Sequence, residues 1–388
     1  MTELKLFKNF ETMKYHNSFC KFLCCYLVLL FILAACKNDA HKIYIDINKP
    51  SADLALKIDK IICLETNEAS LIGEVFKVVQ FNGMFYVLDI LVSKNVFLFN
   101  KNGQFITALS KGKGPNETID PVDVIINKEQ EVVLVWDQGK KELLTFDQKL
   151  NFLNSEHYDM LNIRATKFID EERILVEKPN FEDNAGKQEK FLLYGVYNLR
   201  TKAYESKFFP IQEDLISIAS INPISVTAER ILFSAPFDNS LYTLEGNGYR
   251  EVMHFNFGEM GITADDIKRG NSYVFSESWA GRKIVPFYSI SENERYMALN
   301  FGLYGKDNFF IYSKATNESY FSFNLVNQGL LPNCRLSGQI GEDQFLAFAS
   351  PADVIEFGKI NPMAASIQNE IDELSNPCII IFSIREDN

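Results

Sequence analysis

Two aspartates at equivalent places in the sequence could supply carboxylates to one site. Asp89 follows Val87-Leu88 and Asp137 follows Val135-Trp136, so each ends an apolar run of the same kind. If these runs are matching strands of a repeated unit, both side chains face the same end of it and could bind a cation or a sugar. The alternative is structural, because an Asp at a strand end often hydrogen-bonds the backbone of the following turn. The sequence leaves both roles open and favours the turn.

A second candidate site lies in the irregular segment 258–283, where Trp279 and Arg282 follow Tyr273. An indole ring can stack on the face of a sugar, and a guanidinium can hydrogen-bond its hydroxyl groups. Loops on a rigid scaffold often carry binding residues. Packing of this segment onto its own repeat is the alternative. The sequence favours packing, but this segment is the first place in which to look for a saccharide site.

Other motifs do not support catalysis or metal binding. The stretch Lys111-Gly112-Lys113-Gly114-Pro115 lacks the spacing of a phosphate-binding loop and is interpreted as a turn between repeats. No Gly-x-Ser-x-Gly elbow occurs. The histidines are few and lack the spacing of metal ligands: His16, His41, His157 and His254. We therefore expect no catalytic residue, no metal and no cofactor.

The elements that would position these residues are repeated groups of short strands. Residues 75–123 contain four apolar runs, and the turns Asn82-Gly83 and Asn102-Gly103 are typical of β-hairpins. Residues 122–158 repeat the same order, with Asp137 placed 48 residues after Asp89. Self-similarity at this period is typical of a propeller. More diverged copies follow, at 165–209, 224–257, 284–323 and 334–385.

The last copy has only three strands, at 334–340, 344–349 and 379–385. A propeller leaves no open edge, so a strand from the N-terminal part, either 43–47 or 56–64, should complete it. The predicted fold is all-β, a six-bladed β-propeller of four-stranded antiparallel blades that spans residues 43–388 and is closed by an N-terminal strand. Short helices are expected at 263–268 and, near the C-terminus, at 362–374.

The first 35 residues have the composition of a secretory signal. A 14-residue apolar run at 22–35 follows Lys14 and Lys21 and is too short to span a membrane comfortably. Leu33-Ala34-Ala35-Cys36 resembles the lipobox of bacterial lipoproteins, in which the cysteine is acylated, for example with palmitate. We expect a signal peptide at 1–35, whose true start is either Met1 or Met13, and a lipidated tether at 36–42. An uncleaved signal anchor is the alternative.

Four short stretches resemble a known family: Ile62-Cys63-Leu64-Glu65-Thr66, Ser70-Leu71-Ile72-Gly73-Glu74, Phe85-Tyr86-Val87-Leu88-Asp89 and Gly112-Lys113-Gly114-Pro115-Asn116-Glu117. Together they are similar to the six-bladed, NHL-like β-propeller lipoproteins of Bacteroides-type bacteria. Asn116 departs from the second glycine that is common in the family. The resemblance covers most of the chain after Cys36. It implies the fold and an outer-membrane lipoprotein on the periplasmic or cell-surface side, and it transfers no catalytic residue.

Cysteines offer one further prediction. If the strand at 56–64 completes the last copy, Cys63 lies beside the strand that begins at Cys378. An oxidising compartment would permit a disulfide that locks the ring. Cys334 would remain unpaired, and three free thiols are the alternative.

Charge limits the partners. The chain carries 39 basic and 51 acidic residues, a formal net charge of -12, without a cluster of basic residues of the kind that binds phosphate backbones. We expect no nucleic-acid partner. The function that we expect is a membrane-anchored, non-catalytic lipoprotein whose propeller binds a glycan, a peptide or an envelope protein. The alternative is a hydrolase or lyase that acts on a polysaccharide or peptide at the channel mouth.

Overall fold

The computed structural model describes residues 40–44, 55–158, 162–181, 191–215, 222–322 and 329–385. The expected signal peptide and Cys36 lie outside the described residues, as does most of the tether. The chain divides into two units, 1–41 and 42–388. The second unit contains the fold.

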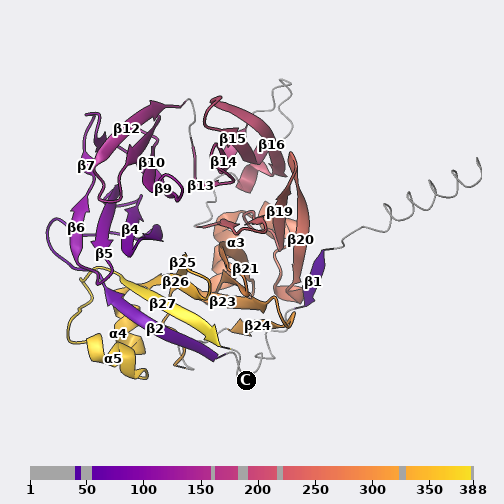
Figure 1. Cartoon of the computed structure of the whole chain (residues 1–388). Helices are drawn as coiled ribbons and strands as arrows, with labels where there is room; N and C mark the ends of the chain where they lie inside the picture. The colour runs from indigo at the N-terminus through magenta and orange to yellow at the C-terminus, as the bar shows by residue number, and fades with distance from the viewer. Residues whose placement is uncertain are drawn as a thin grey trace, which may run out of the picture. The chain divides into compact units, whose positions relative to one another are not determined.

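Six antiparallel sheets surround a common axis (Figure 1). The first strand of each sheet contacts the first strand of the next sheet, and the last of them contacts the first, so these six strands form a closed inner ring. The inner strands are β3 (Lys77–Phe81), β9 (Pro121–Asn127), β13 (Ala165–Phe168), β17 (Ile224–Val226), β21 (Val285–Glu292) and β25 (Arg335–Ile340). This confirms the predicted six-bladed propeller.

The remaining strands of each blade run outward to the periphery. Blade 1 adds β4 (Met84–Asp89), β5 (Asn95–Asn100) and β6 (Phe105–Ala108); blade 2 adds β10 (Val132–Asp137), β11 (Glu142–Phe146) and β12 (Phe152–His157); blade 3 adds β14 (Arg173–Phe181), β15 (Phe191–Asn198) and β16 (Ala203–Ile211). Blade 4 adds β18 (Ile231–Phe233), β19 (Ser240–Glu245) and β20 (Gly248–Asn256); blade 5 adds β22 (Tyr296–Leu303), β23 (Lys306–Ser313) and β24 (Ser319–Ser322); blade 6 adds β26 (Gln344–Ala349) and β27 (Cys378–Arg385).

Local chemistry explains these strands. The strands β4 and β10 are buried at nearly every position because the neighbouring blades cover both faces of each sheet. At the β3–β4 turn, Asn82 and Gly83 both have positive φ, 48° and 74°, which is the conformation that the hairpin turn predicted there requires. The sequence pattern and the backbone therefore agree at the first blade.

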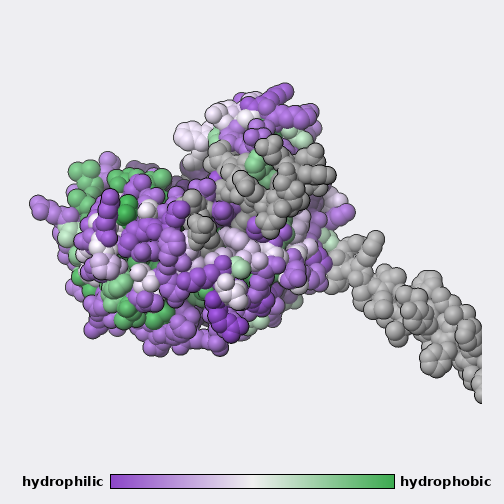
Figure 2. Space-filling model, turned by 90° about the horizontal axis from the view of Figure 1, so that it is seen from above, coloured by the Kyte–Doolittle hydropathy of each residue, from purple (hydrophilic) through white to green (hydrophobic). Residues whose placement is uncertain are grey.

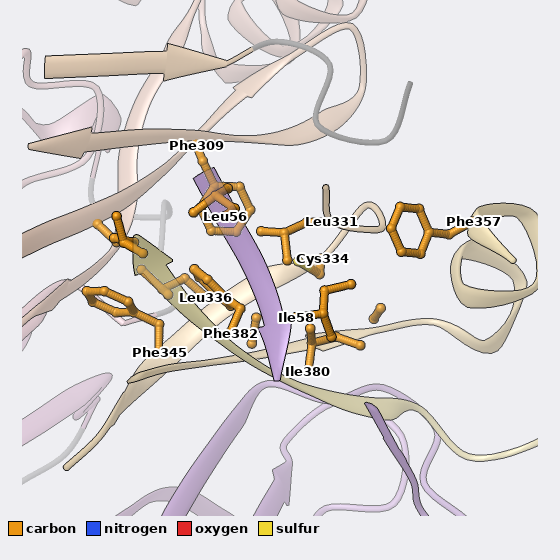
Figure 3. Packing of buried hydrophobic residues seen from close by; sticks show 14 of the residues in the cluster. Leu56, Ile58, Phe309, Leu331, Cys334, Leu336, Phe345, Phe357, Ile380 and Phe382 are labelled. Carbon is orange, nitrogen blue, oxygen red and sulfur yellow. The ribbon is translucent and has the colours of Figure 1, made fainter. Parts of the chain in front are cut away.

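The strand β2 (Ala55–Cys63) completes blade 6. It pairs antiparallel with β27, from Ala55 opposite Arg385 to Cys63 opposite Cys378. Leu56 and Ile58 on β2 are buried against Phe345, Ile380 and Phe382 of blade 6, among other residues (Figure 3). The predicted N-terminal closure is confirmed for the 56–64 candidate. The strand β1 (His41–Tyr44), from the other candidate, lies beside β20 in the sheet of blade 4.

Helices lie in two connections. Thr263 begins α2 (Ala264–Lys268) with a capping box that includes Asp266, which confirms the helix predicted at 263–268. The helix α3 (Asn271–Trp279), which follows it, was not predicted. Short pieces complete the chain: η1 (Glu213–Leu215), η2 (Gly258–Met260), and a parallel pair formed by β7 (Ser110–Lys111) and β8 (Glu117–Thr118).

The helix expected at 362–374 is shorter than predicted. Two helices occur instead, α4 (Pro351–Phe357) and α5 (Pro362–Ile367). The side chain of Gln368 turns back and donates to the carbonyl oxygen of Ile355 at 2.6 Å, which ends α5 against α4. Acidic residues at 370, 372 and 373 would also be unfavourable at a helix C-terminus.

The surface of the molecule is more hydrophilic than the cores between the blades. Figure 2 shows one side of the molecule, on which hydrophilic residues predominate and hydrophobic residues form separate patches. Among the described residues, no helix is both long enough and apolar enough to cross a membrane.

Replacing Ile58 with Ala tests the closure of the ring. Ile58 is 6% exposed, so the variant should lose about 2–5 kcal/mol of unfolding free energy, the usual cost of emptying a packed Ile site. Denaturant titration measures the loss. Ile106→Ala, at a site that is 44% exposed on blade 1, is the control and should change stability by under about 0.5 kcal/mol. Equal stability of the two variants would show that β2 does not pack as described.

Candidate ligand-binding site

Asp89 lies at the end of β4 and is fully buried. Its two oxygens accept backbone N–H bonds from Gly73, Glu74, Leu91, Val92 and Ser93 at 2.9–3.2 Å. Burial alone would raise the pKa of this carboxyl, but the donated bonds outweigh it and lower the pKa. The carboxylate thus holds together the turn that enters blade 1 and the turn that leaves β4.

Asp137 has the same role at the end of β10. It accepts backbone N–H bonds from Ile119, Asp120 and Lys140 at 2.6, 3.2 and 3.1 Å. Both aspartates lie at the end of the ring where the inner strands begin, since Leu88 pairs with Lys77 and Asp137 pairs with Pro121. They share a face of the propeller, as expected, but each is occupied by its own turn. Ligand binding by either stays a prediction.

Trp279, at the end of α3, is 73% exposed, and Tyr304, in the β22–β23 hairpin, is 59% exposed. Each ring lies over a glycine beside the other residue. A Cβ on Gly305 would come within 3.4 Å of the indole, and a Cβ on Gly281 would come within 1.9 Å of Cε1 of the tyrosine ring. Both glycines also have positive φ, 66° and 73°. We call these four residues the aromatic clasp.

Hydrogen bonds fix the two sides of the clasp to each other. The backbone N–H of Tyr304 donates to the carbonyl of Ser278 at 2.9 Å, and the hydroxyl of Ser278 donates to the carbonyl of Gly302 at 3.1 Å. Ser278 is itself buried. The end of α3 is therefore held against the hairpin, and the two exposed rings are held in place rather than left on a loose loop.

The other predicted residues of this segment divide between the two ends of α3. Arg282 follows the clasp and forms a two-bond ion pair with Glu277, both bonds at 2.6 Å. Tyr273 lies more than one helical turn before Trp279, and its hydroxyl accepts a bond from Arg269 at 2.8 Å. The structure thus brings Trp279 and Arg282 to one end and leaves Tyr273 at the other. Their binding roles stay predictions.

The sequence analysis missed Tyr304. Its position in a Tyr-Gly turn between two predicted strands was the available signal, because an aromatic at a hairpin turn lies outside the blade core. Nothing in the sequence connects it with Trp279, which is 25 residues earlier.

A cavity of about 340 Å³ lies on the axis of the ring and is lined by residues of all six inner strands. It extends to the turns that follow β9 and β13, so it occupies the end where the inner strands finish. The face with Asp89 and Asp137 is the opposite one. A cavity of this size suits a small ligand.

A ring of buried polar side chains, one from each blade, lies at the inner end of the cavity. We call it the polar belt: Lys77, Asp123, Thr166, Asn222, Ser289 and Ser337. Lys77 pairs with Asp123 at 2.5 Å, and the Thr166 hydroxyl donates to Asp123 at 2.7 Å. Asn222, Ser289 and Ser337 bond main-chain groups of other blades. The belt therefore joins blades across the axis.

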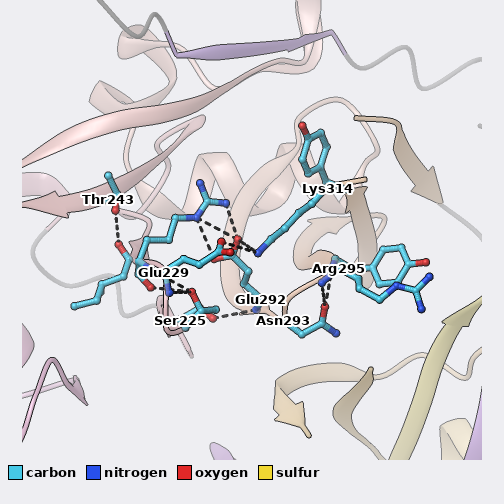
Figure 4. A network of polar contacts seen from close by, with 12 residues as sticks. Ser225, Glu229, Thr243, Glu292, Asn293, Arg295 and Lys314 are labelled. Atoms are coloured by element: carbon cyan, nitrogen blue, oxygen red, sulfur yellow. Dashed lines mark hydrogen bonds and ion pairs between the residues drawn. The ribbon is translucent and has the colours of Figure 1, made fainter. Parts of the chain in front are cut away.

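Another buried charge joins blades 4 and 5. Glu292 ends β21 and is fully buried between the guanidinium of Arg230, at 2.6 Å, and the ammonium of Lys314, at 2.9 Å (Figure 4). Its backbone N–H donates to the hydroxyl of Ser225. The carboxylate is fully engaged by these contacts, so its evident role is to fix the two blades.

Glu177, on β14, is a buried carboxyl of a different kind. It is 0% exposed, and neither oxygen has a hydrogen-bond partner among the residues that the structure describes. Burial raises its pKa to about 8, against an opposing effect of Arg164 and a smaller like-charge effect of Asp123. Near neutral pH this side chain is a protonated acid.

The predicted thiol pair is in register. Cys63 and Cys378 face each other in the β2–β27 ladder with their Sγ atoms 3.7 Å apart, both as free thiols. The disulfide stays a prediction. In the described ranges, no group of three or more His, Cys, Asp or Glu side chains is placed to hold a metal ion.

The fold and the sites together define the class: a six-bladed β-propeller with an aromatic clasp on one blade and a cavity on its axis. The chain belongs to the family described as Domain of unknown function (DUF4934), whose model matches residues 48–383. No curated protein matches the chain.

Two solved structures with a similar fold come from Bacteroides. A protein of Bacteroides fragilis NCTC 9343 that is described as exported is 17% identical with a TM-score of 0.69, over 89% of this chain and 99% of that one. A member of the DUF4221 family from Bacteroides vulgatus ATCC 8482 is 12% identical with a TM-score of 0.54, over 86% of this chain and 99% of that one. At these identities the likeness concerns the fold.

Replacing Glu177 with Gln should change how stability depends on pH. The folded protein keeps the Glu177 proton up to about pH 8, whereas the unfolded chain releases it near pH ~4.3. Between these values the unfolding free energy of the native protein falls as pH rises, by roughly 1 kcal/mol per pH unit. The Gln variant lacks this contribution, so its advantage over the native protein should grow from pH 5 to pH 8.

Denaturant titrations at pH 5 and pH 8 measure the effect, with Glu259→Gln as the control at an exposed site. A Glu177→Gln variant that follows the same pH dependence as the native protein would contradict the raised pKa.

Proposed function

We propose that this protein is an exported, lipid-anchored β-propeller of the NHL-like type that binds glycans through the aromatic clasp, without catalysing a reaction. One observation carries the proposal. Trp279 and Tyr304 expose most of their surfaces to solvent yet are held firmly by the backbone around Gly281 and Gly305. Large aromatic side chains that are rigid and exposed are typical of binding surfaces, because little conformational entropy is lost when they bind.

The chemistry of the clasp favours a sugar. Aromatic ring faces carry partial negative charge and pack well against the C–H groups of a sugar ring. Arg282 and Glu277, three residues after and two before Trp279, place charged hydrogen-bonding groups near the same end of α3. The flat apolar rings match the C–H face of a saccharide, and the polar groups beside them match its hydroxyl groups. A peptide or an envelope protein remains an alternative partner.

The proposed location rests on the N-terminal sequence. The apolar run at 22–35, followed by the lipobox-like Leu33-Ala34-Ala35-Cys36, supports export and acylation of Cys36. The description of the similar Bacteroides fragilis protein as exported also supports export of this protein. We propose the outer membrane, with the propeller on its periplasmic or cell-surface side. One acyl chain binds weakly, so stable anchoring takes more than one.

Glycan microarrays of bacterial and host oligosaccharides test binding. The native protein should bind a subset of them, and Trp279→Ala and Tyr304→Ala should each weaken that binding at least tenfold, which is about 1.4 kcal/mol. Tyr44→Ala is a matched control, because Tyr44 is a tyrosine that is 75% exposed on β1, outside the clasp. Circular dichroism checks that each variant folds.

Two results would count against this proposal in different ways. A native protein that binds none of the oligosaccharides would remove the glycan function. A clasp variant that binds as well as the native protein would keep the function and move the site elsewhere.

Replacing Cys36 with Ser tests the anchor. In a Bacteroides-type host the native protein should fractionate with membranes and carry acyl groups detectable by mass spectrometry, whereas the variant should lose both, because it lacks the thiol that is acylated. An acylated or membrane-bound Ser variant would contradict anchoring at Cys36.

One observation favours the enzyme alternative. Glu129 and Glu171 lie on adjacent turns that line the axial cavity, and the pKa of Glu129 is raised because its protonated form donates a hydrogen bond to Glu171. Two carboxyl groups that share a proton could act as acid and base. Release of shorter fragments from a bound polysaccharide or peptide, abolished by Glu171→Gln, would establish the hydrolase or lyase in place of the binding protein.

A further inference from the structure

The axial cavity contains a lysine that has no partner among the described residues. Lys167 follows Thr166 of the polar belt on β13, so it lies near the inner end of the cavity that it lines. Its side chain is half-buried. It forms no hydrogen bond and no ion pair with any residue in the described ranges. Even a half-buried ammonium without a counter-charge is unfavourable, and proteins normally pair such a group.

Asp123, the acid whose charge attracts Lys167, does not serve as that partner. Asp123 accepts from Lys77 at 2.5 Å and from the backbone N–H of Val124 at 2.9 Å through Oδ1. Its Oδ2 accepts from the backbone N–H and the hydroxyl of Thr166, at 2.6 and 2.7 Å. Both oxygens are therefore saturated. The inner end of the cavity has two lysines and one carboxylate that is already bonded.

The electrostatics agree with this geometry. Burial, with smaller contributions from the charges of Lys77 and Lys128, lowers the pKa of Lys167 to about 7 against the attraction of Asp123. Lys128 belongs to the turn after β9. An anion beside Lys167 would reverse these effects by supplying the missing counter-charge.

The rest of the lining limits the kind of anion. The walls carry many aliphatic side chains, including Val124, Ile224 and Ile290, each from a different inner strand. The acids of the lining are on the turns after β9 and β13: Glu129, Asp170 and Glu171, of which Asp170 is paired with Arg173 at 2.6 Å. An ion with several charges would meet these acids and would find only Lys128 and Lys167 as cations in the lining. An apolar body with one negative charge fits both regions.

We propose that the axial cavity is a second binding site, which takes a small organic monocarboxylate with its carboxylate against Lys167 and its apolar body between the inner strands. The clasp and this cavity are separate. Trp279 and Tyr304 are not among the residues that line the cavity. Tyr304 follows the last residue of β22, and that end of β22 pairs with the beginning of β21. The cavity is lined instead by the last part of β21. The proposal does not depend on glycan binding.

Isothermal titration calorimetry with hexanoate and hexanamide tests the site. The two probes have the same shape and differ in charge. We expect hexanoate to bind the full-length propeller in the millimolar range and hexanamide to bind at least tenfold more weakly. Lys167→Met keeps the apolar stem and should weaken hexanoate binding at least tenfold, whereas Lys167→Arg should retain it. Lys111→Met, at an exposed site on β7, is the control.

The pH dependence gives a second measurement. Hexanoate is ionised throughout the range from pH 6 to pH 9, but Lys167 loses its proton as pH rises through its pKa of about 7. Affinity for the native protein should therefore fall across that range. It should stay constant for Lys167→Arg, because a guanidinium remains charged.

Four results would overturn the proposal: no binding of millimolar hexanoate, equal binding of hexanamide, unchanged binding by Lys167→Met, or an affinity that does not change with pH. Thermal melts check that each variant is folded, so that a loss of binding is not caused by unfolding. Lys167→Met removes a half-buried charge and should fold at least as well as the native protein. Trp279→Ala should bind hexanoate normally, so failure of the glycan proposal and failure of this one are distinguishable.

Discussion

The pairing of β2 with β27 is the constraint on which the rest of the propeller depends. Each blade of a ring buries both faces of its sheet against its neighbours, so an incomplete blade exposes a strand edge and weakens two interfaces. Blade 6 takes its outer strand from residues 55–63, far away in sequence. Leu56 and Ile58 then enter the same core as Phe309 of blade 5 and Phe345 of blade 6. Ile62 of the same strand packs with Val78 and Phe97 of blade 1. Closure therefore fixes blade 6 between blade 5 and blade 1 and holds the inner strands around the axis.

The closed inner ring has two ends, and the surfaces at these ends differ. At the end where the inner strands begin, turns anchored by Asp89 and Asp137 connect the blades, and the clasp extends from the β22–β23 hairpin. Toward the other end, the same strands line the cavity. The polar belt separates the two ends, because its buried hydrogen bonds and its ion pair occupy the axis. A ligand on one surface need not disturb the other.

Local patterns in the sequence predicted the strands, the turns and the closing strand, because these depend on residues that are close together in the sequence or on a repeat that can be counted. The Asn82-Gly83 turn, the matching Asp89 and Asp137, and the missing strand of the last copy were enough for the blades and their closure. The clasp could not be predicted, because Trp279 and Tyr304 meet only through the backbone conformations of Gly281 and Gly305. Lys167 looks like an ordinary strand lysine until six inner strands are assembled and Asp123 is seen to be saturated. The end of the helix predicted at 362–374 was placed too late for a similar reason, since Gln368 ends α5 through a contact with α4.

Hydrogen exchange measured by mass spectrometry tests the closure most directly. In the intact chain, the amides of β2 that donate to β27 should exchange as slowly as those of β27, because they are bonded in one ladder. Fast exchange at residues 55–63 together with slow exchange at residues 378–385 would show that another element completes blade 6 and would contradict the account.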